Sequence, residues 1–376
     1  YNLGLFYLKG RTVTRNIKTG IELITKAAEG GNKYAHYSIG SFLCRGKYEL
    51  KKDLKAGTTW LRKSIDNGHL DAVQNYHHFT GFCYPRKERF AFQIEVLRKG
   101  AEAGHAYSMG WYGRKMINGD GIKKDRVEGA KWVQKSAALN DYHGLADLAD
   151  IYRHGVGDVK QDFAKAVEIH KGLTKRGHLV SMHNLGAIYS KGKGNVKQDF
   201  ELAAKYFQMS VDHENDRSLI ALSNIYRDGV GVEQDIEKAI KLLKRAVDAK
   251  HYSAYSYLGY IHDRDTYRKK DLEKSIHYYT KGADLGEKYS QNALANFYLE
   301  GKGVPKDTEA AIKLYRLAAK QKYRHAQFKL GTFHEKGIYG FKVDIKAATE
   351  FYQAAAKQDY EKAQEALKRL GIELQK

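Results

Sequence analysis

Three groups of residues have side chains or spacings that could support chemistry: Gly-x-Gly turns, histidines, and tyrosines accompanied by arginines and amides. The Gly-x-Gly turns include Gly192–Gly194, Gly229–Gly231 and Gly301–Gly303. A phosphate-binding glycine loop follows a strand and carries a third glycine or a Gly-Lys-Ser/Thr ending. None of these turns has those features. The glycines are therefore predicted to break helices, because glycine adopts backbone angles that other residues resist.

The histidines and potential nucleophiles also lack the spacing that catalysis or metal binding needs. Zinc ligands occur in local pairs such as Cys-x-x-Cys or His-Glu-x-x-His, and no such pair occurs among the 16 histidines and two cysteines. A Gly-x-Ser-x-Gly nucleophile motif is absent as well. The sequence predicts no catalytic residues, no metal and no cofactor, and we expect a protein that is not an enzyme.

These residues sit on a unit that recurs along the chain, most clearly between Ile225 and Ala239. Tyr226 closes an amphipathic helix, Gly229–Gly231 breaks it, and Asp235 is placed to cap a second helix. From Asp125 onward, the cap-type aspartates recur every 36 or 37 residues, and the interval before Asp125 is twice as long. The full set is Asp53, Asp125, Asp162, Asp199, Asp235, Asp271, Asp307 and Asp344.

A fixed period of this length predicts a solenoid, in which each helical hairpin buries its apolar stripe against its neighbours. Only Pro85 and Pro305 could interrupt helices, and no apolar run is long enough to span a membrane. We predict an all-α solenoid of about ten helix-turn-helix repeats over residues 1–360. Residues 361–376 have apolar side chains at helical spacing and are predicted to form a C-terminal capping helix.

Three segments depart from the repeat, and we expect turns there that differ from the regular short loop. They are Arg11–Asn16, Gly81–Glu88 and Asp263–Lys270. The two cysteines, Cys44 and Cys83, lie in neighbouring units. Adjacent helices pack about 8–10 Å apart, whereas a disulfide needs Cα atoms about 4.4–6.8 Å apart. We therefore expect unpaired thiols.

The repeated details resemble one family, the Sel1-like repeats. The clearest copies combine a Leu-Gly or Leu on the first helix, a Gly-x-Gly turn, a capping Asp and an Ala-Ala pair on the second helix. Examples are Leu185-Gly186, Gly192-Lys-Gly194, Asp199 and Ala203-Ala204, and likewise Leu294, Gly301-Lys-Gly303, Asp307 and Ala318-Ala319. The resemblance implies a right-handed superhelix of the TPR-like superfamily, with the first helix of each pair on the concave side. It also implies protein binding in a bacterial adaptor, host-factor-binding or toxin-immunity role.

Helical phase selects the candidate binding residues on that concave side. Residues two before or after each core leucine, and arginines five after it, point to the open face. The predicted partner-binding residues are Tyr37, Gln74, His78, Arg114, Asp150, Arg153, His183, Asn224, Arg227, Tyr260, Asn292, Asn296 and Phe328. Aromatic residues, amides and arginines are typical of interface hot spots. The alternative is that part of this set only contacts the next repeat.

The net charge of +21 predicts attraction to an acidic partner. We expect a monomer that binds an acidic protein. A basic nucleic-acid-binding repeat protein is the alternative, although no single basic arm or block supports it. The sequence begins at Tyr1, inside a first-type helix, so we expect a trimmed N-terminus. The compartment stays open, and the resemblance favours a periplasmic or exported location over a cytoplasmic one.

Overall fold

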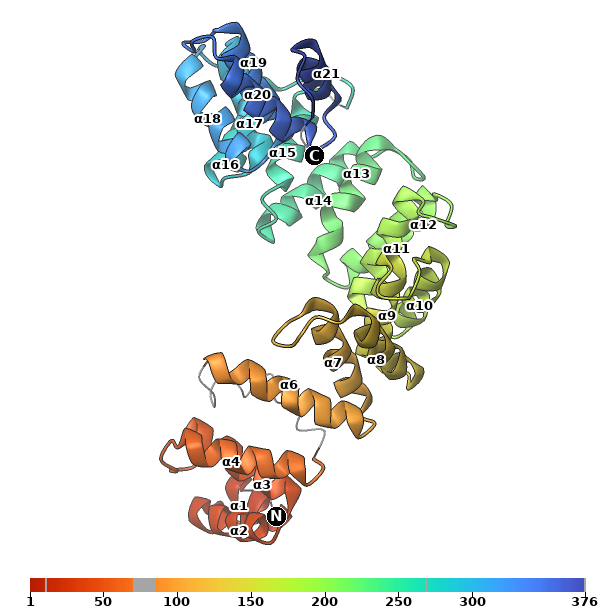
Figure 1. The fold of residues 1–376 in the computed structure, drawn as a ribbon, viewed down its shortest axis with the longest axis vertical. Coiled ribbons are helices and arrows are strands. Elements are labelled where there is room, and N and C mark those ends of the chain that lie inside the picture. Colours follow the sequence, from red (N-terminus) through yellow and green to blue (C-terminus); the bar gives the residue numbers. More distant parts are fainter. Residues whose placement is uncertain (11, 70–85, 268, 375–376) are drawn as a thin grey trace. The chain divides into compact units, whose positions relative to one another are not determined.

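The computed structural model describes residues 1–10, 12–69, 86–267 and 269–374, and the described chain is helical almost throughout (Figure 1). This confirms the predicted all-α class. Helices that follow one another in the chain pack as pairs, for example α3 with α4, α7 with α8, and α17 with α18.

The helices fall into two alternating series. The first helices of the pairs are α1 (Asn2–Lys9), α3 (Lys33–Arg45), α7 (Ala106–Asn118), α9 (Tyr142–His154), α11 (Leu179–Lys191), α13 (Leu219–Asp228), α15 (Ala254–His262), α17 (Lys288–Glu300) and α19 (Arg324–Lys336). The second helices are α2 (Ile17–Glu29), α4 (Leu54–Asp66), α6 (Arg86–Glu102), α8 (Arg126–Ala138), α10 (Phe163–Lys175), α12 (Phe200–Asp212), α14 (Ile236–Asp248), α16 (Leu272–Asp284), α18 (Thr308–Lys320) and α20 (Ile345–Ala356). A short 3₁₀ helix, η1 (Asp216–Ser218), precedes α13, and α21 (Glu361–Arg369) follows α20.

The aspartates that mark the repeat are helix caps, as predicted. Seven of the eight have an extended backbone, and the side chain of each of the eight accepts a hydrogen bond from the backbone N–H three residues later. In the clearest unit, Asp235 Oδ1 lies 2.8 Å from Lys238 N. This bond satisfies one of the otherwise unpaired amides in the first helical turn. The period of the sequence is therefore the period of the second-helix starts.

Glycine is needed in the Gly-x-Gly turns for two reasons: a left-handed backbone conformation, and the close approach of a neighbouring repeat. Gly229 ends α13 with a φ of 64°, and Gly231 has a φ of 71°. A Cβ atom on Gly231 would lie 2.4 Å from the carbonyl carbon of Phe200. A side chain at this position would therefore separate two neighbouring repeats.

The three segments expected to be irregular have different outcomes. For Arg11–Asn16 the expectation is wrong: Gly10 ends α1 in the left-handed region and Asn16 caps α2, so the spacing from Lys9 to Ile17 equals that from Asn118 to Arg126. Glycine lies one residue before the expected segment, and asparagine replaces the capping aspartate.

The expectation is confirmed at Asp263–Lys270. There α15 ends at Asp263 in the right-handed helical region, without a glycine, and α16 begins only at Leu272. Of the third segment, Gly81–Pro85 lies outside the described residues, and α6 begins at Arg86.

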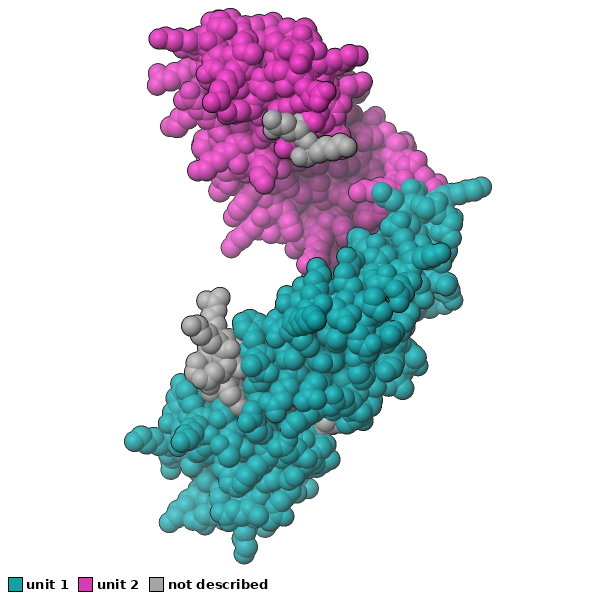
Figure 2. All heavy atoms as spheres, in the orientation of Figure 1, with its two compact units in different colours: residues 1–181, 192–197 teal, residues 182–191, 198–376 magenta. Residues whose placement is uncertain are grey.

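The chain divides into two compact units. Unit 1 consists of residues 1–181 and 192–197, and unit 2 of residues 182–191 and 198–376 (Figure 2). Within unit 2 the core alternates first-helix leucines with small or aromatic second-helix residues. Leu222, Ala239 and Leu243 are fully buried, and Gly259 leaves room for the ring of Tyr279.

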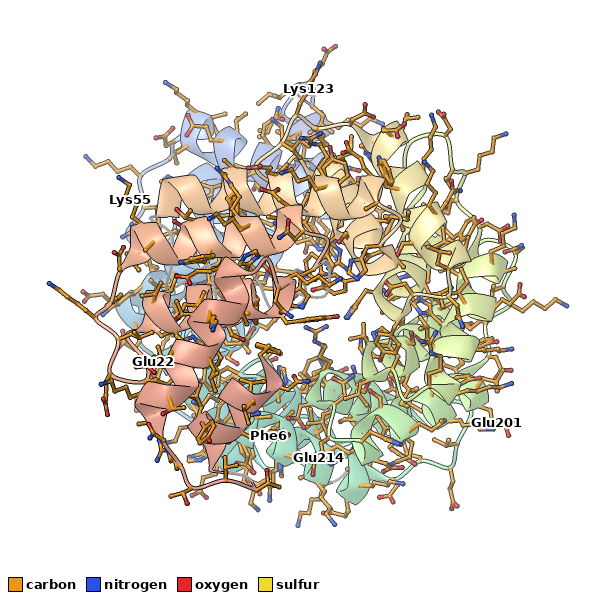
Figure 3. The ribbon with its side chains drawn as sticks, turned by 90° about the horizontal axis from the view of Figure 1, so that it is seen from below. Phe6, Glu22, Lys55, Lys123, Glu201 and Glu214 are labelled. Atoms are coloured by element: carbon orange, nitrogen blue, oxygen red, sulfur yellow. The ribbon has the colours of Figure 1, made fainter. Side chains whose placement is uncertain are left out.

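The C-terminal segment forms α21, which buries Ala363 and Leu367 in a cluster with Tyr352 of α20. Charged side chains such as Lys55, Lys123 and Glu201 are exposed and project away from the ribbon (Figure 3). No helix among the described residues is both long enough and apolar enough to cross a bilayer.

The expectation of unpaired thiols is wrong for Cys44. This residue, which is fully buried on α3, takes part in a disulfide. The only other cysteine of the sequence, Cys83, lies outside the described residues. Our expectation assumed two regular helices at their usual separation, whereas Cys83 falls in a stretch whose sequence departs from the repeat.

Candidate partner-binding site

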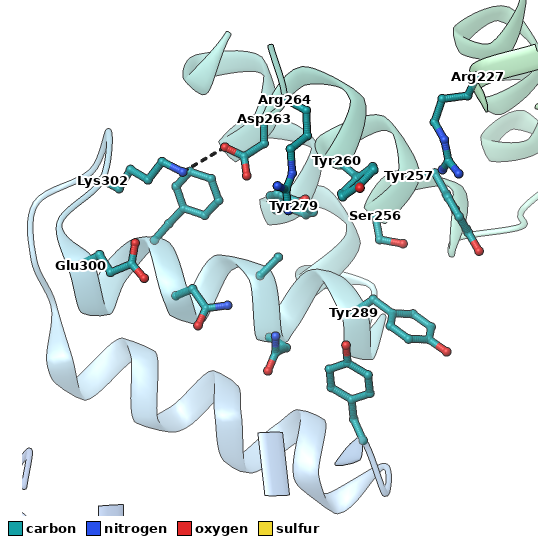
Figure 4. A pocket seen from close by; sticks show the side chains of 15 residues that line it. Arg227, Ser256, Tyr257, Tyr260, Asp263, Arg264, Tyr279, Tyr289, Glu300 and Lys302 are labelled. Carbon is teal, nitrogen blue, oxygen red and sulfur yellow. Dashed lines mark hydrogen bonds and ion pairs between the residues drawn. The ribbon is translucent and has the colours of Figure 1, made fainter. Parts of the chain in front are cut away.

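Four of the predicted binding residues lie together in unit 2, around one open cavity. Arg227, Tyr260, Asn292 and Asn296 line a pocket of about 660 Å³ that we call the tyrosine pocket (Figure 4). Tyr257, Tyr279, Tyr289 and Tyr323 complete its aromatic lining. The volume is within the usual range for ligand pockets, about 300–1,000 Å³.

Helix periodicity explains why these side chains meet. Tyr260 on α15 is one turn after Ser256, and Asn296 on α17 is one turn after Asn292, so each pair shares a helix face. The opposite faces of the same two helices carry the buried residues Leu258 and Leu294, which pack into the core. Because α15 and α17 pack directly against each other, their outward faces combine into one surface.

Arg227, at the end of α13, is held in place by several contacts. Its Nε and Nη2 atoms donate to the carboxylate of Asp228 at 2.7 and 2.6 Å. Its guanidinium lies 5.6 Å from the ring centroids of both Tyr260 and Tyr267. Burial is the largest single influence and lowers the pKa of Arg227, but the hydrogen bonds to Asp228, the charge of Asp228 and the neighbouring tyrosines together raise the pKa above its usual value. The charge of Arg227 is thus largely compensated within the chain.

The opposite end of the pocket carries a second compensated cation. Lys302 Nζ lies 3.1 Å from Asp263 Oδ1, and Lys270 Nζ lies 3.7 Å from the same oxygen. Figure 4 shows the Lys302–Asp263 pair beside Glu300. Asp263 comes from the irregular turn after α15, so this turn contributes directly to the pocket wall.

Arg264, the next residue of that turn, differs from the other two cations. Its guanidinium lies 5.0 Å from the ring centroid of Tyr260, which favours the cation through the negative face of the ring. Among the described residues, no carboxylate is within ion-pair distance of it. The pocket therefore presents one arginine whose charge is not neutralised by the protein.

The two asparagines have different hydrogen-bonding states. Asn296 Oδ1 accepts a hydrogen bond of 2.6 Å from the hydroxyl of buried Tyr315, which orients the amide. Asn292 Oδ1 is shielded from solvent and has no hydrogen-bond partner among the described residues. A buried acceptor without a donor is costly, so Asn292 Oδ1 gains free energy if the amide turns toward an N–H group in the pocket.

The tyrosines of the pocket act as neutral contact surfaces. Tyr289 and Tyr323 meet edge to face, with centroids 5.0 Å apart. Burial raises the pKa of Tyr323 to about 12 and also raises the pKa of Tyr279. Both hydroxyls stay protonated at neutral pH, so these rings can pack and form hydrogen bonds but cannot act as bases.

The predicted residues in unit 1 are mostly engaged by the fold. Arg114 on α7 forms an ion pair with Asp147 on α9, whose side chain is only 10% exposed. Asp150 and Arg153 pair with each other at 2.8 Å. Tyr37 packs edge to face on His69, and burial raises its pKa to about 12.

The remaining predicted residues lie apart from the tyrosine pocket. His183 Nδ1 and Ser218 Oγ are 2.9 Å apart, and Phe328 packs against Tyr352 and Tyr360. Asn224 on α13 has a buried Oδ1 without a partner among the described residues. Gln74 and His78 lie outside the described residues.

Sequence reasoning missed the residues that the irregular turn and the helix starts contribute. Asp263 and Arg264 line the pocket, and Tyr267 packs on Tyr260 with centroids 5.8 Å apart. The signal was available, because a glycine turn is replaced by charged and aromatic residues at this point of an otherwise regular repeat. Tyr289 and Tyr323 are not at the spacings from a core leucine that we used to select candidates, and nothing else in the sequence pointed to them.

Comparisons with known proteins agree with this architecture. No curated protein shows a significant match to the chain. The structure is similar to that of a protective antigen with an SLR fold, present in uropathogenic Escherichia coli strains, with 25% identity, a TM-score of 0.63, and coverage of 94% of this chain and 84% of that chain. A Sel1 repeat protein from Oxalobacter formigenes is 25% identical with a TM-score of 0.64, over 84% of this chain and 92% of that chain.

The sequence also matches a family model described as the Sel1 repeat. The matched residues are 1–32, 33–69, 106–141, 143–171, 179–215, 217–251, 253–287, 288–323 and 324–360. The unmatched interval between residues 69 and 106 holds the unit whose sequence departs most from the repeat. Because copies of this repeat cover most of its length, the chain belongs to the Sel1 repeat family.

Proposed function

We propose that this Sel1 repeat protein is a non-enzymatic scaffold that binds an acidic protein partner through the tyrosine pocket of unit 2. The observation that carries the proposal is the composition of the pocket, in which tyrosines, two asparagines and an unneutralised arginine converge. Large aromatic residues and arginine supply most of the energy at protein interfaces. Whether the role is that of an adaptor, a host-factor-binding protein or an immunity protein depends on the partner.

Two features support binding rather than a purely structural role for the pocket. First, the oxygen of Asn292 is closed to solvent and has no donor among the described residues, so a turn of this amide toward a partner N–H would remove an existing cost. Second, Tyr289 is 46% exposed although it stands beside the aromatic ring of Tyr323. Exposed aromatic residues next to unused polar groups are typical of a recognition surface.

The proposal can be tested by selecting octapeptides from a random phage library on the whole chain and measuring their affinities. We expect Tyr260→Ala and Asn292→Ala to weaken the selected peptides by about 1–3 kcal/mol each. Tyr252→Ala is the matched control, because Tyr252 is 38% exposed and lies outside the pocket. Unchanged affinity for both pocket variants, with melting temperatures also unchanged, would exclude this site.

Nucleic-acid binding is the second candidate, and the net charge of +21 favours it. Non-specific binding to a labelled DNA duplex should weaken steeply as salt rises. Peptide binding through aromatic contacts should lose much less affinity over the same salt range. Tight duplex binding that persists in the pocket variants would favour the nucleic-acid alternative and place it on another surface.

A further inference from the structure

We infer that the tyrosine pocket recognises a carboxylate on an extended peptide segment, with the guanidinium of Arg264 as the receptor for that carboxylate. This inference rests on the proposed function, since it specifies the chemistry of the partner at the same pocket. The argument depends on which charges of the pocket are already neutralised and on which polar atoms are unused.

Three cations line the pocket, and only one of them lacks a carboxylate partner among the described residues. Arg227 donates two hydrogen bonds to Asp228. Lys302 pairs with Asp263, which also attracts Lys270. Arg264 has an aromatic partner, the ring of Tyr260, but no ion pair. An anion entering the pocket therefore gains most from Arg264, because the charges of the other two cations are already compensated.

The guanidinium of Arg264 is better suited to bind a carboxylate than a lysine ammonium would be. A guanidinium offers parallel N–H donors that match the two oxygens of a carboxylate. The contact with the face of Tyr260 uses none of the N–H donors of Arg264, and the side chain is exposed. Tyr260 also lies 5.6 Å from the guanidinium of Arg227, so the ring is held between two arginines. Less side-chain freedom is lost on binding when the receptor group is held in this way.

The asparagines can hold the backbone that carries the carboxylate. Asn292 Oδ1 is shielded and has no donor among the described residues. Rotation of this pocket-lining amide brings the oxygen to a backbone N–H, the donor that every residue of a peptide except proline supplies. Asn296 uses its Oδ1 for Tyr315, which leaves its amide N–H groups to donate to a backbone carbonyl. A pocket of about 660 Å³ has room for a short stretch of extended chain.

Glu300 sets the direction in which the carboxylate lies. It is exposed at the end of α17 and lines the same pocket as Arg264. Figure 4 shows Glu300 beside Lys302, with Arg227 at the far side of the drawn residues. A like charge repels a carboxylate, so the acidic residue of the peptide belongs at Arg264, away from Glu300.

The test uses octapeptides selected from the phage library on the wild-type chain and then synthesised with each Asp or Glu replaced by its amide. We expect one such replacement to weaken binding to the wild-type chain about tenfold, as charge-assisted hydrogen bonds imply. The same replacement should cost less than about twofold on the Arg264→Gln variant, because the receptor for the charge is gone. Arg217→Gln is the matched control, since Arg217 is exposed in unit 2 and lies outside the pocket.

Two results would overturn the inference. One is a set of selected peptides without acidic residues that still lose affinity in Tyr260→Ala; the tyrosine pocket would then stand as a protein-binding site, but without the preference for an acidic partner. The other is an amide replacement that costs the same on the wild-type and Arg264→Gln chains, which would place the carboxylate elsewhere. If neither Tyr260→Ala nor Asn292→Ala changes the affinity of the selected peptides, the proposed function is wrong. Thermal unfolding of each variant checks that it is folded.

Discussion

The α7–α9 region of unit 1 and the α13–α17 region of unit 2 each place an arginine against an aromatic ring of a first helix, with opposite results. In unit 1, Arg114 stacks on Trp111 and pairs with Asp147 of the following repeat. In unit 2, Arg264 stacks on Tyr260 and has no carboxylate partner among the described residues. An arginine beside an aromatic ring is therefore paired with a carboxylate in unit 1, whereas in unit 2 it remains available to a ligand.

The aromatic residues follow the same division. Tyr107 packs with Trp111 and His143 in unit 1, with centroid distances of 6.0 and 5.6 Å. In unit 2, Tyr260 and Tyr289 line an open pocket. Face position in a repeat protein thus identifies residues that could bind a partner, and the contacts from the next repeat decide which of them stay available. Four substitutions test this comparison.

The largest effect should come from removing the core that positions the pocket. Leu222 is fully buried on α13, so Leu222→Ala should destabilise the fold by about 3 kcal/mol, as for other buried leucines. Chemical denaturation followed by circular dichroism measures the change. Leu317→Ala is the control, because that side chain is 42% exposed and its loss should cost less than about 0.5 kcal/mol. Equal losses would contradict the assigned core.

Arg114→Ala should destabilise unit 1, where the arginine is paired within the fold. Burial raises the pKa of Asp147, and the hydrogen bond from Arg114 opposes that effect. Removing Arg114 leaves a buried carboxylate without its partner, which should cost about 1–3 kcal/mol at pH 7. The double variant Arg114→Ala/Asp147→Asn should recover part of the loss. If the single variant is as stable as the wild-type chain in urea denaturation, the ion pair of Arg114 does not stabilise the fold, and the contrast with Arg264 is lost.

Acid should weaken unit 1 through His170. This residue is 1% exposed, its Nδ1 lies 2.9 Å from Ser181 Oγ, and burial lowers its pKa to about 3. Between about pH 6.5 and 3 the unfolded chain binds a proton that the folded chain does not, so stability falls as pH drops, by up to about 1.4 kcal/mol per pH unit. His170→Gln should flatten the dependence measured by denaturation at pH 7 and 5. The same change at exposed His277 is the control and should leave the slope as it is.

The smallest effect is expected at the acidic rim of the tyrosine pocket. Glu300→Gln removes a like charge and should strengthen a carboxylate-bearing octapeptide about twofold, the scale of exposed charge pairs. Titration calorimetry at low and high salt measures it, and the gain should shrink as screening increases. Glu309→Gln, exposed and outside the pocket, should have no effect. Weaker binding of the acidic peptide to Glu300→Gln would reverse the assigned direction.

The sequence by itself determined the helices and their repeat, because these depend on interactions within a few residues. A capping aspartate such as Asp235 bonds an amide three residues away, and a glycine such as Gly229 ends a helix through its own φ. The apolar phase of each helix likewise follows from spacing alone. The same phase selected Arg227, Tyr260, Asn292 and Asn296, which the structure brings to one pocket.

Only the tertiary structure decided which of these groups are already engaged. The Arg114–Asp147 pair joins residues on two different repeats, and Tyr315 reaches Asn296 from the second helix of the pair. The availability of Arg264 and the disulfide of Cys44 depend in the same way on what packs nearby. Such contacts depend on side chains that packing brings together from distant points in the chain. Periodicity can place a residue on a face, but it cannot assign the residue's partner.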